Sequence, residues 1–159
     1  MAVPAIIDNW SAFYSGSAFV RSAVNFAHLG GLVGGGGCAI AADRAVIRAC
    51  RGGREARHAH LAAWHSTHTA VVVGLVLVMA SGLLLLGADL DAYLESVVFW
   101  FKMALVALLL GNGILVLNAE RRVESGDERA WVILKRVSIA SLVLWFATTL
   151  AGVVLPNAL

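Results

Sequence analysis

Four apolar stretches separated by polar segments follow one another along the chain between residues 18 and 155. Each is close to the roughly 20 residues that an α-helix needs to cross a bilayer. The pattern predicts transmembrane helices at about 18–43, 60–88, 93–118 and 131–155. The acidic turn at Asp89 is short, so the second and third helices should be antiparallel neighbours. We therefore expect an all-α fold, an integral membrane four-helix bundle that forms a single domain over residues 1–159.

The composition and the charge distribution extend this picture. The chain is 60% hydrophobic and 14% charged, whereas soluble domains are about 25% charged. Ten of the 12 Lys and Arg residues lie in segments 44–57 and 121–136. The positive-inside rule therefore predicts cytoplasmic loops there, with the N- and C-termini on the outer side. Residues 1 to about 16 contain no basic residue, which is not typical of a cleavable signal peptide. We expect these residues to form an amphipathic segment at the outer interface of the membrane. Nothing in the sequence supports nucleic-acid binding.

Away from the ends of the predicted spans, the ionisable residues are His28 in the first, Lys102 in the third and, less deeply, His65 and His68 in the second. Such residues cost a few kcal/mol or more in a bilayer, so each suggests a function. His28 lies about six residues into the apolar stretch that begins near Ser22, roughly 9 Å deep. Lys102 lies about five residues into the stretch that begins near Val97, at a matching depth, so the two could share one site. Two alternatives remain open. His28 could instead form a hydrogen bond to a neighbouring helix, and Lys102 could extend to the outer interface.

The first predicted span holds six glycines within residues 30–37. Gly31 and Gly35 lie three and seven residues after His28, on the same helical face, and Arg21 lies seven residues before it. A flat ligand held by His28 would meet no side chains on this face. The alternative is that the glycines allow close packing between helices.

Histidines gather at the start of the second predicted helix. Their spacing places His58, His65 and His68 on one stripe, while His60 points elsewhere. Imidazole binds zinc, copper and haem iron, and the chain offers too few nearby ligands for a closed zinc site. We expect haem b between two helices. The preferred axial ligands are His28 and His68, with His65 as a substitute for His68.

The predicted spans separate the two preferred ligands along the membrane normal. The offset between His28 and His68 is roughly 10–20 Å at 1.5 Å per residue, and a haem between neighbouring helices tolerates only part of that range. Met79 and Met103 lie closer in depth to His28. A haem ligated by histidine and methionine is therefore an alternative.

Short motifs in all four spans resemble a known group of proteins over about residues 18–155. The chain is similar to small four-helix bacterial membrane proteins related to the copper resistance protein D and cytochrome b561-like superfamily. It is more distantly similar to the membrane protoporphyrinogen oxidase of the HemJ type. The resemblance implies a bacterial inner (plasma) membrane location and a haem or porphyrin at a site that involves His28 and Lys102. The motifs are Ala27-His28-Leu29-Gly30-Gly31, Val78-Met79-Ala80-Ser81-Gly82, Phe101-Lys102-Met103-Ala104-Leu105 and Ser141-Leu142-Val143-Leu144-Trp145.

These observations favour a b-type haem protein for electron transfer, alone or as the membrane subunit of a redox complex. Arg21 and Lys102 are candidates to bind the haem propionates. One alternative is a cofactor-free accessory subunit that docks a larger complex through the glycines or forms a homo-oligomer. Another is a copper-handling protein that uses His65, His68, Met79 and Met103. A porphyrin-oxidising enzyme is a further alternative, but no catalytic motif is visible and no catalytic residue is predicted.

Overall fold

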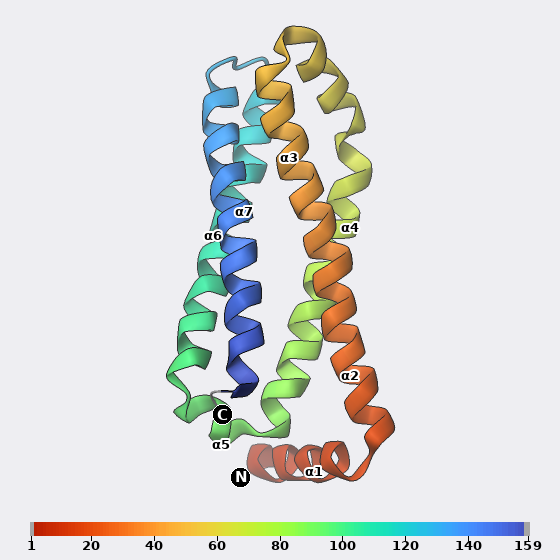
Figure 1. Cartoon of the computed structure of the whole chain (residues 1–159). Helices are drawn as coiled ribbons and strands as arrows, with labels where there is room; N and C mark the ends of the chain where they lie inside the picture. The colour runs from red at the N-terminus through yellow and green to blue at the C-terminus, as the bar shows by residue number, and fades with distance from the viewer. Residues whose placement is uncertain (1, 158–159) are drawn as a thin grey trace.

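The structure, a computed structural model, describes the backbone of residues 2–157 and the side chains of residues 5–53, 55–57 and 69–157. Every element in this part of the chain is helical, and Figure 1 shows the long helices side by side. The α-helices are α1 (Ala2–Gly16), α2 (Ala18–Gly31), α3 (Gly37–Arg51), α4 (Gly53–Ala88), α5 (Leu90–Glu95), α6 (Val97–Glu124) and α7 (Ala130–Val154). A π-helical segment, η1 (Leu32–Gly36), joins α2 to α3, and a 3₁₀ turn, η2 (Leu155–Asn157), follows α7.

Four helical stretches are long and apolar enough to cross a membrane, as the hydropathy pattern predicts. They are Ala18–Arg51, Thr69–Ala88, Val97–Glu124 and Ala130–Asn157. Large apolar side chains, among them Phe19, Phe26 and Val97, are exposed on the outside of the bundle. A surface of this kind suits lipid better than water. The arrangement indicates a membrane protein.

Serines and glycines set the ends of the long helices. Ser17 precedes α2 and accepts a hydrogen bond from the Val20 N–H, and Ser96 caps α6 in the same way. The turns after α3 and α6 contain glycines with positive φ, 79° at Gly53 and 91° at Gly126, a conformation that L side chains rarely adopt.

The connections α3–α4 and α6–α7 lie at one end of the bundle, which we call the loop end. Helices α1 and α5 and both termini lie at the other, which we call the terminal end (Figure 1). The basic segments expected between the spans are largely helical. Helix α3 continues to Arg51, and α4 begins two residues later at Gly53.

The bundle consists of two helix pairs joined through α3. Helix α2 packs against α4, helix α6 packs against α7, and α3 packs against both α4 and α7. Near the loop end, α3, α6 and α7 enclose a buried apolar cluster that includes Val46, Val123 and Leu134. A second cluster, around Ala39, Leu109 and Trp145, lies nearer the middle of the helices.

Helix α1 lies across the terminal end of the bundle, nearly perpendicular to the long helices (Figure 1). Two hydrogen bonds connect α1 to the end of α4. The Trp10 indole donates to the Leu84 carbonyl at 2.8 Å, and the Ser11 hydroxyl donates to the Ala88 carbonyl at 2.7 Å. A helix in this position is suited to the membrane interface, which is the location predicted for residues 1–16.

Candidate functional site

His28 lies on α2 and faces α4, where its Nδ1 is 3.0 Å from the hydroxyl oxygen of Ser81. The Ser81 hydroxyl donates its hydrogen to the Leu77 carbonyl at 2.6 Å. The Val78 carbonyl is a longer contact of the same hydroxyl, at 3.2 Å. With the single hydroxyl hydrogen assigned to Leu77, the Ser81 oxygen accepts from the Nδ1–H of His28 in the Nδ1-protonated tautomer. The neutral imidazole then carries its lone pair on Nε2, the nitrogen that can bind a metal or accept a proton. A histidine hydrogen-bonded to a neighbouring helix, one of the sequence alternatives, is therefore confirmed.

The His28 ring lies next to Gly82 of α4. A Cβ atom at residue 82 would lie 3.4 Å from His28 Cε1, an ordinary van der Waals contact, so the ring packs directly against α4 at this residue.

Lys102 lies on α6 in the same half of the bundle as His28. Its side chain is half-buried and extends toward α7, with Nζ 3.6 Å from the position that a Cβ of Gly152 would occupy. The ammonium group is also close enough to His28 for its charge to act on the imidazole. The shared site that the matching depth of the two residues predicts stays a prediction.

The predicted ligand face on α2 is covered by α4. A Cβ at Gly35 would lie 2.7 Å from Gly74 Cα, and a Cβ at Gly31 would lie 2.8 Å from Val78 Cγ2. These glycines do not leave an open surface for a flat ligand, because α4 occupies it. They instead allow α2 and α4 to pack closely, and this contact brings Ser81 opposite His28.

The side chains of His58, His60, His65 and His68 lie outside the described residues. The backbone of α4 is continuous through this region, and Ser81 is thirteen residues beyond position 68. That separation is about 20 Å along the helix axis. His28 meets α4 at residues 81–82, so the structure does not bring it opposite the histidine-rich segment. The pairing of His28 with His68 or His65 therefore has no support from the helix packing.

The two methionines are placed differently. Met79 is 44% exposed on the outer surface of α4, whereas Met103 is partly buried next to Lys102 on α6. Among the described side chains, no group of three or more His, Cys, Asp or Glu residues could hold a metal ion.

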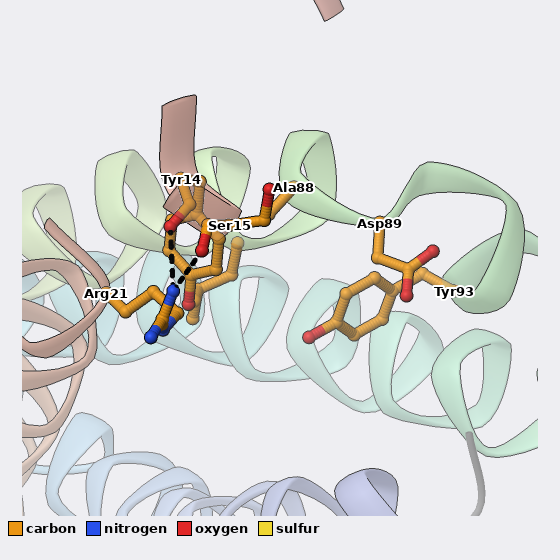
Figure 2. A pocket seen from close by; sticks show the side chains of 7 residues that line it. Tyr14, Ser15, Arg21, Ala88, Asp89 and Tyr93 are labelled. Atoms are coloured by element: carbon orange, nitrogen blue, oxygen red, sulfur yellow. Dashed lines mark hydrogen bonds between the residues drawn. The ribbon is translucent and has the colours of Figure 1, made fainter. Parts of the chain in front are cut away.

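Arg21 lies at the mouth of a cavity of about 370 Å³ at the terminal end (Figure 2). Its guanidinium donates to the backbone carbonyls of Tyr14 and Ser15, the last turn of α1. Tyr93 and Asp89 line the cavity as well. Burial, with smaller contributions from Tyr14 and Asp89, raises the pKa of the Tyr93 phenol. Arg21 precedes His28 by seven residues, about 10 Å along the helix.

Two buried carboxylates were missed by the sequence reasoning. Asp43, interpreted as the point where polar sequence resumes, is only 5% exposed inside the bundle, as is Glu120 on α6. Asp43 lies four residues after buried Ala39 and three before buried Val46, on one face of the helix. This spacing could have indicated from the sequence that Asp43 lies on the buried face of its helix. Ser81 carried no such signal, because a single serine in an apolar helix is common.

Comparisons of the chain with protein families, curated proteins and solved structures found no match. The similarity to the copper resistance protein D and cytochrome b561-like superfamily therefore stays a prediction. The arguments about function that follow depend on the geometry of the chain itself.

Proposed function

We propose that the chain binds a b-type haem in the terminal half of the bundle, with Nε2 of His28 as an axial ligand. The hydrogen bond from His28 to Ser81 carries this proposal. Histidines that bind metals almost always donate their other ring N–H to an acceptor, which fixes the tautomer and the ring orientation. Ser81 supplies this acceptor, because its own hydrogen is donated to Leu77.

The charges around His28 suit the acidic edge of a haem. Arg21 is about 10 Å from His28 along α2, and Lys102 on α6 is close enough for its charge to act on the His28 imidazole. Guanidinium and ammonium groups bind carboxylates, so these two residues are suited to the propionates. Haem iron would supply one-electron chemistry. We therefore propose electron transfer as the function, alone or within a membrane redox complex.

Haem content of purified variants tests the assignment. His28→Ala should lose the haem or change its absorption spectrum. His60→Ala is the matched control, because the helical stripe places His60 away from the other histidines. Full haem occupancy with an unchanged spectrum in His28→Ala would overturn the ligand assignment.

We propose in addition that the loop end faces the cytoplasm of a bacterial inner membrane. Ten of the 12 Lys and Arg residues belong to its two segments, 44–57 and 121–136. Single cysteines placed at Glu55 and at Asp91 in a Cys38→Ala, Cys50→Ala background would test the orientation. A membrane-impermeant maleimide added to intact cells should label the cysteine at position 91 and spare the one at position 55.

A second candidate function, docking to another membrane subunit, is favoured by one observation. Gly30, Gly34 and Gly37 have no neighbouring atoms within 4 Å of where a Cβ would lie. Small residues in this arrangement let a helix of a partner approach closely. Gly34→Leu should then abolish co-purification of the partner while the haem content of the chain stays unchanged.

A further inference from the structure

Helices α3, α6 and α7 bring together a second set of buried polar side chains, remote from His28. The haem proposal does not use these residues. Asp43 on α3 and Glu120 on α6 are each 5% exposed, and Ser138 on α7 is fully buried at 0%. Glu120 is close enough to Asp43 for their charges to interact. Ser138 and Ser141 lie beside the Asp43 carboxyl group.

Several oxygens of this group form no hydrogen bond with the described residues, although the hydroxyls of Ser138 and Ser141 lie close to the Asp43 carboxyl group. Asp43 Oδ2, both Glu120 carboxyl oxygens and the Ser138 hydroxyl oxygen are buried without a hydrogen bond in the described part of the chain. The ion pairs among described side chains, Arg57–Glu128 and Arg122–Asp127, lie at the loop end and involve neither acid. A buried charge without a partner costs several kcal/mol. Two adjacent carboxylates therefore require a proton or another cation.

A cavity of about 220 Å³ reaches Asp43 from between α3, α4, α6 and α7. Its walls are mostly aliphatic, and Asp43 is the one ionisable side chain among the described residues that line it. Ser141 and Trp145 are the other polar residues of the lining. For comparison, an engineered apolar cavity of about 150 Å³ binds benzene. The cavity is thus large enough for a small organic molecule.

The apolar walls and the charge at the end of the cavity define the kind of molecule that fits. A lipophilic body would be buried against the aliphatic side chains, where transfer from water is favourable. A cationic head group would pair with the Asp43 carboxylate, the one ionisable side chain among the described residues that line the cavity. The indole of Trp145 lines the same space and can interact favourably with a cation.

We propose that this cavity is a binding site for a small lipophilic organic cation, such as an arylalkyl ammonium ion, whose charged group pairs with Asp43. The site is separate from His28 and Lys102, so a test of this proposal does not depend on whether the chain binds haem. A proton alone on the two acids is the competing explanation, and it predicts no preference for a cationic ligand.

Isothermal titration calorimetry with 2-phenylethylammonium and its neutral analogue 2-phenylethanol tests the proposal. The full chain in nanodiscs of zwitterionic lipid avoids attraction of the probe to anionic headgroups. We expect saturable binding of one ammonium per chain, with the alcohol at least tenfold weaker. Equal affinity for the two probes, or no saturable binding of the ammonium, would overturn the proposal. This comparison uses the unmodified protein and needs no variant to fold.

Two isosteric variants locate the binding site. Asp43→Asn removes the charge with little change in shape and should weaken ammonium binding at least tenfold. Thr148→Val is the matched control, because Thr148 is a buried α7 residue with an unpartnered hydroxyl that does not line the cavity. It should bind the ammonium as the unmodified protein does. Unchanged ammonium affinity in a folded Asp43→Asn variant would contradict the assignment.

Discussion

His28 Nδ1 and the Ser81 hydroxyl oxygen are joined by a hydrogen bond of 3.0 Å. With the hydroxyl hydrogen assigned to the Leu77 carbonyl at 2.6 Å, the imidazole is the donor. The bond connects α2 with α4, fifty-three residues apart in sequence. It holds the imidazole with Nε2 as the lone-pair nitrogen, and so prepares a ligand position within an apolar bundle.

Substitution of Ser81 tests this orientation. Ser81→Ala leaves the His28 Nδ1–H without its acceptor, so we expect haem affinity to fall by about 10- to 100-fold, as for other residues that orient a ligating histidine. The reduction potential of any haem retained should shift as well, because the ligand becomes less basic. Ser81→Thr keeps the hydroxyl and should retain both properties. An Ala variant with unchanged haem content and potential would contradict the role of Ser81.

The contact between Gly35 and Gly74 predicts where the bundle is sensitive to added volume. A Cβ at residue 35 would lie 2.7 Å from Gly74 Cα, a backbone atom that cannot move aside. Gly35→Ala should therefore destabilise the protein by about 1–3 kcal/mol, the usual range for overpacking. Gly34→Ala is the control, since nothing lies within 4 Å of its Cβ position. Unfolding in mixed micelles with increasing denaturing detergent measures the difference, and equal stabilities would contradict the packing.

The phenol of Tyr93 should titrate above the ordinary tyrosine range. Burial first, and then Tyr14 and Asp89, raise its pKa. The folded protein keeps this proton where the unfolded chain has lost it, so stability falls as the pH rises from the ordinary tyrosine pKa through the raised one. An ultraviolet difference titration of the unmodified protein against Tyr93→Phe measures the pKa. Asp89→Asn should lower it, and a Tyr93 pKa in the ordinary range would be inconsistent with this environment.

Much of the fold could be predicted from hydropathy, because lipid exposure requires long apolar helices and leaves few other solutions. The helix pairing could not: the second and third spans were expected to be neighbours, whereas in the described structure α4 packs mainly against α2 and α3, and α6 packs against α7. Gly31 and Gly35 were correctly placed on the face of His28, but periodicity within one helix cannot say whether a ligand or another helix covers that face. Gly74, which lies far along the chain, decides this point.

The candidate site was predictable only in part, because the pattern within one helix does not show which residues of other helices lie against it. The depths of His28 and Lys102 follow from residue counting, and the two lie close enough for the Lys102 charge to act on the imidazole. Asp43 and Glu120 sit among basic residues in the sequence and were interpreted as part of polar segments. The spacing of Asp43 from Ala39 and Val46 indicates a shared helical face, but which helices cover that face depends on α3 packing between α4 and α7, which no local pattern encodes.

The most direct test of the central claim is the reduced-minus-oxidised absorption spectrum of the chain purified in mild detergent from cells supplied with haem precursor. A pyridine haemochrome assay on the same sample gives the haem type and amount. Our account predicts a b-type spectrum with about one haem per chain. A folded, homogeneous protein that contains no haem, and takes up none when haem is added, would contradict it.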